Sequence, residues 1–526
     1  LVLRQIPMIK DGRVVGAIDL ALERAYVWRE RQPSEITEIP DAEKAAEVEA
    51  RYQMLERIAD YDDQLMEELL SDINPPRDEI FTDLAKEMKA GLICPVLIGS
   101  AERGNGIGRL LKALRHEAPG LEETQARLGL TPKNDAVVQI LKTFHTQHGG
   151  KLQVSRVLAG KVVDGAVLIG AGGLSDRVSG IYRLTGKENV KRPEALAGET
   201  VGLGKIEPAK TGMTFTTAKA GITQFATLKA PQPVMKFTIS AYDHKDDAKL
   251  SMSLAKIVEE DPALTLRQDK ESGETIFAGQ GEMHLRVALE RLEHKFQIKA
   301  KTAAAEVPYK ESYHGSVSVR GRHKKQSGGH GQFGDVALEV TAGARGSGFQ
   351  FIDRITGGVV PRQYIPAVEE GTREFLEKGL HGFPVVDIQV ALTDGSYHTV
   401  DSSDMAFKMA AQIGMREALG KLNSVLLEPV LKVSITTPSD ATARINQIVS
   451  GRRGQLLGYD GRPDWDGWDV VEALIPQAEM EGLIVEIRSA TQGVGSFTHS
   501  FHELAEVTGH IAAKVIEKAK AAMAEA

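Results

Sequence analysis

Residues 276–301 read IFAGQGEMHLRVALERLEHKFQIKAK, which predicts a short apolar strand, an amphipathic helix and a second strand. The helix carries its apolar residues on one stripe, as a helix does when it packs on a sheet. These residues are Leu285, Ala288, Leu289, Leu292 and Phe296. Upstream, VMKFTIS (234–240), DAKLSMSLAKIVEED (247–261) and LTLRQD (264–269) predict a strand, a helix and a strand. The resulting order, βαββαβ, is that of a ferredoxin-like sandwich.

The same order returns after Leu427. Strand PVLKVSITT (429–437) precedes a helix, two strands, a helix and a last strand, without obvious sequence identity to the first copy. The repeat is therefore evidence about fold alone. Two ferredoxin-like α+β sandwiches are predicted to flank a different, central α+β domain.

The first half of the chain has two other patterns. The helix-forming segment 41–72, broken once, is followed by the apolar run LICPVLIG (92–99) and a helix over 106–120, the order of a doubly wound α/β domain. Residues 135–226 consist of short alternating strands with glycine turns, which predict a small β-barrel. The chain opens at Leu1 with a hairpin closed by Asp11-Gly12, so we expect it to start inside a domain.

Bulk composition limits the function classes. The 526 residues predict three to four domains, and the net charge of −8 means that any nucleic-acid contact must come from a local patch. The single cysteine, Cys94, excludes an internal disulfide framework and is expected to be buried. With no secretory signal and no apolar run of spanning length, we expect a cytoplasmic protein without a membrane partner.

The glycine-rich stretch KKQSGGHGQFGDV (324–336) matches the kinase pattern G-x-G-x-x-G-x-V letter by letter. The strand lysine that a kinase requires is replaced by Glu339, and no HRD or DFG sequence occurs. A dinucleotide site requires a helix after the glycines, whereas DVALEV predicts a strand. The glycines instead indicate a turn between two strands that lets the backbone approach a partner closely, and a plain hairpin loop is the alternative.

Metal and catalytic patterns are absent from the sequence. His502-Glu503 is followed by Glu506 rather than histidine, so zincin spacing is missing, and no metal site is expected. No P-loop of the form G-x-x-x-x-G-K-[ST] occurs. We therefore assign no catalytic residue.

Positive charge concentrates beside the glycine turn, at Arg320, Arg322, Lys324 and Lys325. Such cations can contact phosphates, although a solvated strand face is the simpler interpretation of a charge run. The glycine turn shifts the balance toward nucleic acid. A second segment offers Tyr397 and His398, which can stack on or hydrogen-bond to RNA, while Asp401, Ser402 or Ser403 can cap the next helix.

Several stretches, in this order, closely resemble translation elongation factor G over essentially the whole chain. They are IFAGQGEMHLRVALERLEHKF, KKQSGGHGQFGDV, YHTVDSSDMAFKMA, LLEPVLKVSITTP and GRRGQLLGYD. The resemblance implies six parts: a C-terminal part of a P-loop GTPase-type domain with a helical insertion, a domain II barrel, ferredoxin-like domains III and V around a tip domain IV, and a C-terminal helix. Their expected ranges are 1–122, 131–228, 232–303, 304–424, 425–510 and 511–526.

By the same resemblance, the chain lacks the P-loop and switches of the family and is expected neither to bind GTP tightly nor to hydrolyse it. GTP and Mg²⁺ are implied for the full-length protein, with backbone at Ser100 and Ala101 in the guanine site. Partners implied are the ribosome, tRNA and mRNA, contacted by a monomer. The implied tip contacts extend the cationic patch through the loop: Arg320, Arg322, Lys324, Lys325, Gln326, Ser327, Gly328, Gly329, His330, Gly331, Gln332, Tyr397 and His398.

Two positions depart from the family pattern: His330 stands where Arg is frequent, and Asp335 where His is frequent, which makes the loop less basic. We therefore expect an elongation factor G or an elongation factor G-like paralogue that promotes translocation. The alternatives are a ribosome-protection or recycling GTPase of the same family, and a non-catalytic RNA-binding module.

Overall fold

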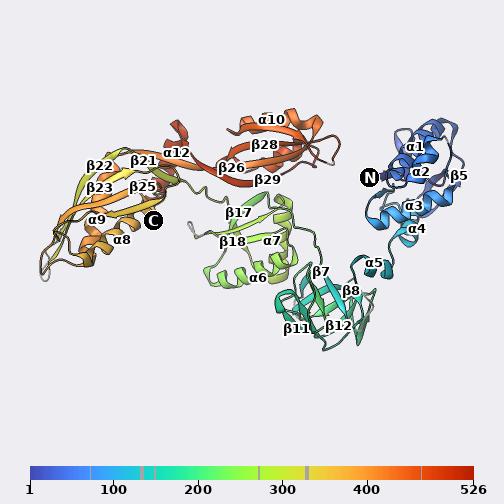
Figure 1. Cartoon of the computed structure of the whole chain (residues 1–526), viewed down its shortest axis with the longest axis horizontal. Coiled ribbons are helices and arrows are strands. Elements are labelled where there is room, and N and C mark those ends of the chain that lie inside the picture. Colours follow the sequence, from blue (N-terminus) through green and yellow to red (C-terminus); the bar gives the residue numbers. More distant parts are fainter. Residues whose placement is uncertain are drawn as a thin grey trace. The chain divides into compact units, whose positions relative to one another are not determined.

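The structure is a computed structural model that describes residues 1–71, 73–130, 135–146, 150–186, 188–269, 273–325, 331–463 and 465–525. It contains two compact units (Figure 1). The first comprises residues 1–142 and 151–226, and the second comprises 143–150 and 227–526. The finer division into six parts stays a prediction. No helix in the described ranges is long and apolar enough to cross a membrane.

The first unit begins with a parallel strand pair and an antiparallel meander. Strand β1 (Val2–Leu3) pairs with β6 (Pro95–Val96), and the meander contains β2 (Gln5–Lys10), β3 (Arg13–Asp19), β4 (Arg24–Arg29) and β5 (Gln32–Thr37). Asp11 and Gly12 have φ of 51° and 72°, the conformation that a tight two-residue hairpin requires. The helices are α1 (Lys44–Ala59), α2 (Asp63–Leu70), α3 (Arg77–Ala90), α4 (Ile107–Glu117) and α5 (Leu121–Arg127).

The expected buried strand over 92–99 is wrong in extent. Only Pro95 and Val96 form a strand, and both are half-buried, because among the described residues only β1 pairs with this segment. Cys94 is exposed rather than buried.

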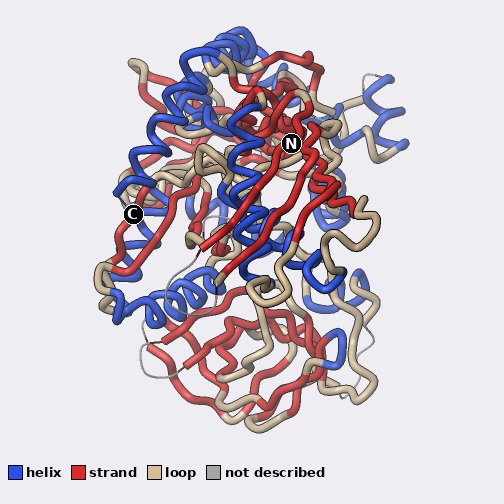
Figure 2. Tube along the Cα trace, turned by 90° about the vertical axis from the view of Figure 1, so that its left-hand side faces the viewer, coloured by secondary structure: helices blue, strands red, loops and turns tan. Residues whose placement is uncertain are grey.

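The second half of this unit is a curved sheet. Its strands are β7 (Val137–Thr146), β8 (Gly150–Ala159), β10 (Val167–Gly170), β11 (Ser175–Arg177), β12 (Ile181–Thr185), β13 (Glu188–Arg192), β15 (Thr200–Gly204) and β16 (Thr214–Thr216), and β9 (Lys161–Val163) pairs with β14 (Glu194–Leu196). The strands curl around one apolar cluster at the bottom of the view in Figure 2. The hydrogen-bonded order, β11-β10-β16-β7-β8-β15-β12-β13, has two ends. The predicted β-barrel is therefore not closed.

The second unit confirms the repeated sandwich. The first copy contains β17 (Met235–Ala241), α6 (Asp247–Glu260), β18 (Thr265–Gln268), β19 (Thr275–Gly279), α7 (Glu282–Phe296) and β20 (Ala300–Ala303). The second contains β26 (Asn423–Pro438), α10 (Thr442–Gly451), β27 (Gln455–Gly461), β28 (Trp468–Pro476), α11 (Leu483–Ala490) and β29 (Ser496–Val507). The strand orders β18-β19-β17-β20 and β27-β28-β26-β29 are the same, 2-3-1-4. Helix α12 (Gly509–Glu525) follows.

In the sequence, the central domain comes between the two sandwiches. Its sheet has the order β22-β23-β25-β24, made of β22 (Ser316–Lys325), β23 (Gln332–Ala342), β25 (Ile388–Ser396) and β24 (Phe349–Asp353). Helices α8 (Ile365–Lys378) and α9 (Asp404–Lys421) pack with this sheet around one apolar core. Strand β21 (Lys310–His314) joins the neighbouring sheet by pairing with β26.

Glycine allows α9 to lie very close to β22 and β23. A Cβ atom on Gly321 would stand 2.1 Å from the Ala410 carbonyl oxygen, and one on Gly334 would stand 2.5 Å from the Ala406 oxygen. Both contacts are to helix backbone, which cannot move aside without shifting the helix. The close approach of helix and sheet in this domain therefore depends on the absence of side chains at these positions.

We predict that Gly321→Ala destabilises the central domain by about 1–3 kcal/mol, because the added methyl group has no space. Gly420→Ala is the matched control, since no atom lies within 4 Å of its Cβ position. The control should be neutral or stabilising by up to about 1 kcal/mol, because alanine favours helix. Hydrogen exchange of β22 and α9 amides in mild urea measures both. Equal exchange in the two variants would contradict the packing argument.

An unpartnered acid lies in the helical part of the first unit. Glu87 on α3 is 1% exposed, and neither carboxylate oxygen has a hydrogen-bond partner within the described part of the chain. Burial and the neighbouring Asp83 raise the pKa of Glu87 to about 7. Because the folded-state pKa lies above the ordinary value, folding favours the protonated form, and the stability of this region should fall as pH rises from about 4.5 to 7.

We predict that Glu87→Gln stabilises α3 by about 1–3 kcal/mol at pH 8 and has little effect at pH 4.5, because the glutamine carries no charge to desolvate. Hydrogen exchange of α3 amides at the two pH values measures the difference. Glu102→Gln, at an exposed turn position, is the control and should change neither value. A Glu87→Gln effect that is the same at both pH values would rule out titration of this carboxyl group.

Candidate functional site

The structure brings the two predicted loop segments together at one end of the central domain. The Gly331 N–H donates to Asp401 Oδ1 at 3.2 Å, across 70 positions of sequence. The Phe333 N–H donates to the Asp401 carbonyl at 2.8 Å, and the Ser402 hydroxyl donates to the Phe333 carbonyl at 2.8 Å. We call the paired ends of β22 and β23 together with residues 397–403 the tip. Its two segments are fixed to each other by side-chain and backbone bonds.

His398 is held by this network with one ring nitrogen left available for hydrogen bonding. The backbone N–H of His398 donates to the Ser402 hydroxyl at 2.9 Å. In the ring, Nδ1 lies 3.2 Å from the backbone nitrogen of Asp401 and 3.1 Å from the Asp401 carboxylate. Nδ1 faces both an N–H donor and a carboxylate, so the neutral ring can accept or donate there, and Nε2 is the ring nitrogen left over as a donor or an acceptor. The half-exposed ring contacts Phe333 edge-on, with centroids 6.5 Å apart. One hydrogen-bonding nitrogen is therefore available at the tip.

Arg320 pairs with acidic side chains of its own domain while its side chain stays half exposed, and its predicted contact with RNA stays a prediction. Its guanidinium donates to both carboxylate oxygens of Asp335, at 2.9 and 3.1 Å, and also contacts Asp394 at 3.4 Å. Asp335 is 4% exposed and accepts a third bond from the Ser396 hydroxyl at 2.7 Å. Burial by itself would raise the pKa of Asp335, but the bonds from Arg320 and Ser396 outweigh it and lower the pKa. The departure at position 335 thus joins β22, β23 and β25.

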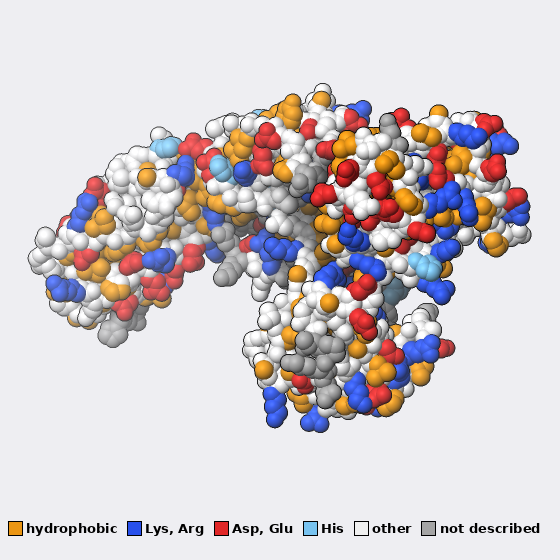
Figure 3. Space-filling view, turned by 45° about the vertical axis from the view of Figure 1, so that its right-hand side comes forward, with side chains coloured by type: hydrophobic (Ala, Val, Ile, Leu, Met, Phe, Trp, Pro, Cys, Tyr) orange, Lys and Arg blue, Asp and Glu red, His pale blue; other side chains and the backbone are white. Residues whose placement is uncertain are grey.

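Three other cations of the tip have no ion-pair partner in the described ranges. The Arg322 guanidinium lies 5.4 Å from the Phe333 ring centroid, a cation–π contact that leaves its charge unneutralised. Lys324 and Lys325 end β22 opposite Phe333 and Gln332, and both side chains are exposed. Elsewhere acidic and basic side chains are interspersed over the face drawn in Figure 3. The tip is thus a local cationic patch on an acidic chain.

Two of the remaining predicted tip residues, Gln332 and Tyr397, lie within the described ranges. Gln332 Oε1 lies 3.0 Å from His323 Nε2, and Tyr397 is 46% exposed. The predictions at Gln326, Ser327, Gly328, Gly329 and His330 lie outside the described residues.

The described glycines of the turn also have a role within the domain. A Cβ atom on Gly331 would stand 2.8 Å from the Asp401 carboxyl carbon, and Gly334 faces helix α9. Their small size lets these parts of the protein approach each other, and the predicted close approach of a partner stays a prediction.

Asp401, Ser402 and Phe333 are the functional residues that sequence reasoning missed. Any of the three polar residues before α9 could cap the helix, but only Ser403 does so, accepting from the Ala406 N–H at 3.3 Å. One residue is enough to cap a helix start, so two of these three polar residues are not needed for capping. Their presence is the signal that could have indicated another structural role.

The segment at Ser100 forms a tight internal turn. The Ser100 N–H donates to the Asn105 carbonyl at 2.9 Å, and the reverse bond is 3.0 Å. The Ser100 amide is therefore already engaged in this turn, and the expected contact of Ser100 and Ala101 with a guanine base stays a prediction. The Ala101 N–H makes no backbone hydrogen bond with any residue that the structure describes.

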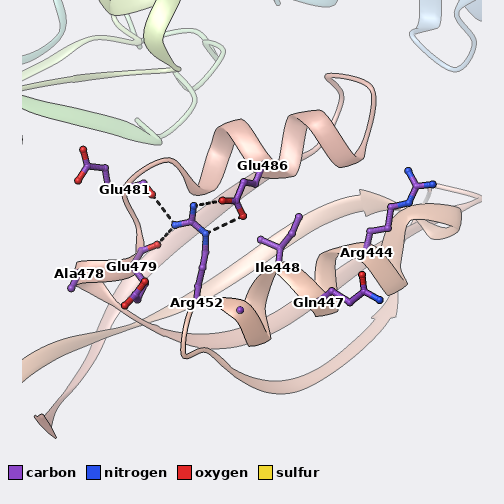
Figure 4. Close-up of a pocket in the computed structure, with 9 residues that line it drawn as sticks. Arg444, Gln447, Ile448, Arg452, Ala478, Glu479, Glu481 and Glu486 are labelled. Atoms are coloured by element: carbon purple, nitrogen blue, oxygen red, sulfur yellow. Dashed lines mark hydrogen bonds and ion pairs between the residues drawn. The ribbon is translucent and has the colours of Figure 1, made fainter. Parts of the chain in front are cut away.

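A groove of about 810 Å³ lies between α10 and α11 (Figure 4). Arg452 spans it, donating to the Glu479 and Glu481 carbonyls and to the Glu486 carboxylate at 2.9 Å. Arg453 pairs bidentately with Glu428 nearby. These bonds fix the two helices, and we assign the groove no chemistry. Over the described residues, no group of three or more histidine, cysteine or acidic side chains could hold a metal ion.

Two ferredoxin-like sandwiches around an α+β domain with a cationic tip define the class of multidomain translation factors. Family models for Elongation Factor G domain III, domain IV and the C-terminus match residues 230–304, 305–422 and 425–515. An elongation factor G-like protein of Synechocystis sp. is 46% identical over 509 residues, which cover 96% of this chain and 75% of that protein. The chain therefore belongs to the elongation factor G family.

Other relatives agree. Elongation factor G of Fervidobacterium nodosum is 35% identical over 528 residues, covering 98% of this chain and 76% of that protein. A crystal structure of a Thermus thermophilus protein superposes with a TM-score of 0.76 at 30% identity, covering 99% of this chain and 77% of that one.

We predict that Asp335→Asn weakens the central domain by about 1–3 kcal/mol at pH 7, because Arg320 loses its buried charged partner and keeps only the longer, exposed contact with Asp394. The pKa of Asp335 is lowered in the folded state, so its contribution is present above the ordinary value and lost as pH falls below about 4. In that pH range the difference in unfolding free energy between the variant and the unmodified chain should become smaller. Urea unfolding followed by exchange of β23 amides measures it. Glu339→Gln, which breaks only the exposed pair with Arg354, is the control and should cost less than about 1 kcal/mol.

Proposed function

We propose that this chain serves an elongation factor that promotes movement of tRNA and mRNA on the ribosome, with the tip as the part that contacts RNA. The observation that carries the proposal is the fixed pairing of two loop segments beside three unneutralised cations, Arg322, Lys324 and Lys325. Cations held at one rigid end can contact successive phosphates without losing much side-chain and loop entropy on binding.

The other exposed groups of the tip suit single-stranded or distorted RNA. Tyr397 offers a stacking surface, and His398 offers Nε2 as a hydrogen-bonding atom for a base edge, or for a phosphate when the ring is protonated. Neither group reads a duplex by itself. Together with the cations, they support contact with RNA whose bases are accessible, such as a tRNA loop or unpaired mRNA.

We assign GTP and Mg²⁺ to the full-length protein. At the turn near Ser100, the Ala101 N–H is the backbone donor that could meet a guanine base, since the Ser100 amide is engaged with Asn105. Hydrolysis in the full-length protein would reorient rigid domains, and the cytoplasm is the compartment that this role requires.

The similarity to an elongation factor G-like protein supports a second candidate within the family. Asp335, which neutralises Arg320, makes the tip less cationic than a patch of four free charges. A ribosome-protection or recycling factor would use the same domains with a weaker demand on the tip. A translocation assay with the intact GTP-loaded protein separates these two, because only the first moves tRNA and mRNA.

We predict that the double reversal Lys324→Glu and Lys325→Glu reduces translocation by the intact protein at least tenfold, because like charges would then face the RNA phosphates. Single-turnover tRNA movement on ribosomes measures the effect. The matched control reverses Lys229 and Lys249, two exposed lysines with no ion-pair partner in the described ranges. The control should retain activity, and equal loss in both double variants would contradict a specific role for the tip.

A further inference from the structure

We propose that strand β27 and the turn that follows it form a docking edge for an extended, cationic segment of another protein. This surface lies in the C-terminal sandwich and is separate from the tip, so the inference goes beyond the proposed function. We call residues 455–463 and 465–468 the β27 edge. The occupant is inferred from the strand's free backbone, its side chains and its charge.

Strand β27 is an edge strand. It pairs with β28 on one side and is the last strand of its sheet. All seven of its residues are exposed, among them Leu457 and Tyr459 at 50% and 58%. Long exposed edge strands that carry apolar side chains are normally covered, shortened or paired with another chain. The bulge at Leu457, between the paired residues Leu456 and Gly458, interrupts the edge but leaves Tyr459–Gly461 in regular register.

The free backbone groups of this edge can be identified. The Arg462 N–H donates to the Trp468 carbonyl at 2.7 Å, so Arg462 faces β28. Backbone direction alternates along an antiparallel strand, so Asp460 also faces β28 whereas Tyr459 and Gly461 face outward. Pairing with β28 leaves these two outward N–H groups unused, and no second strand pairs with β27 in the described part of the sheet. An added strand would find two donors and two acceptors there.

Aromatic side chains extend the edge. Trp465 is 44% exposed and contacts Trp468 edge-on, with centroids 5.1 Å apart. The Arg462 guanidinium stacks on Trp465 at 3.4 Å from the ring centroid. The turn thus already holds one cation against an indole, the type of contact that a lysine or arginine of a partner would repeat.

Charge selects the class of partner. Asp440, Asp460 and Asp466 are exposed and have no ion-pair partner among the described residues, and Asp440 lies at this end because the Ser439 N–H donates to the Gly467 carbonyl. Together with Arg462, which also lacks an ion-pair partner in the described ranges, the three carboxylates give this end three negative charges against one positive. This excess of negative charge opposes a phosphate backbone and favours lysine or arginine. A basic protein segment that pairs by strand addition therefore fits the β27 edge better than RNA does.

The test uses the whole chain and a fluorescent peptide of eight residues that alternates lysine and valine. A second peptide alternates lysine and proline, which keeps the charge but lacks half of the N–H groups and cannot add as a strand. We expect saturable binding of the first peptide by fluorescence anisotropy and at least tenfold weaker binding of the second. Equal binding of the two would overturn strand addition and indicate charge attraction alone.

Two variants localise the site. Tyr459→Pro removes an outward N–H without touching the bonds to β28, and Asp460→Lys reverses a charge; each should weaken peptide binding at least tenfold. Tyr459→Val keeps the N–H, and Glu377→Lys reverses an exposed charge on α8; both should bind as the unmodified chain does. Circular dichroism confirms folding of each variant.

Three results would sink the proposal. The first is unchanged peptide binding by the Asp460→Lys variant, because this substitution reverses a charge without altering the backbone. Another is a twelve-residue oligouridine that binds through Tyr459 and Asp460 more tightly than the peptide, which would assign the edge to RNA. The third is concentration-dependent dimerisation abolished by Tyr459→Pro, which would assign it to a second copy of this chain.

Discussion

Strand β26 takes part in the pairing of two domains, and the position of the tip depends on it. Its first residues pair with β21, and the rest pair with β28 and β29 within the C-terminal sandwich. Glu311 on β21, 1% exposed, then accepts from the N–H groups of Leu380, His381 and Phe383 in the central domain. Because backbone pairing and a buried carboxylate cannot slide gradually, a displacement of the sandwich is transmitted to the central domain rather than absorbed between them.

At the tip, carboxylates likewise hold neighbouring segments of the chain together. Asp335 and Asp401 lie within a cationic patch, where each would be expected to weaken phosphate binding. Both point inward instead, Asp335 to Arg320 and Ser396, and Asp401 to Gly331 and His398. Their negative charges are used to fix backbone and side chains. One arginine, Arg320, is thereby neutralised. The strands that carry the other three cations are held together in return.

The sequence predicted the periodic parts of this fold well, for a physical reason. Both sandwiches follow from apolar stripes and alternating strands, which are local patterns. Closure of the β7–β16 sheet, by contrast, depends on hydrogen bonds between its end strands, and no local pattern reports those bonds. The site divided in the same way. Lys324, Lys325 and His398 were visible as chemistry, whereas Arg320 could be recognised as structural only once Asp335 was placed beside it.

The net charge of −8 describes no single surface of this chain. Within the described residues, the tip has three cations without ion-pair partners, and the β27 edge has three aspartates without them. Both the tip and the β27 edge consist of an antiparallel strand pair with aromatic side chains, so backbone geometry and stacking do not distinguish the two surfaces. The sign of the charge without ion-pair partners distinguishes them. In the two proposals made above, this charge directs the tip toward phosphates and the β27 edge toward lysine and arginine, so that the two proposed partners would compete little for the same surface.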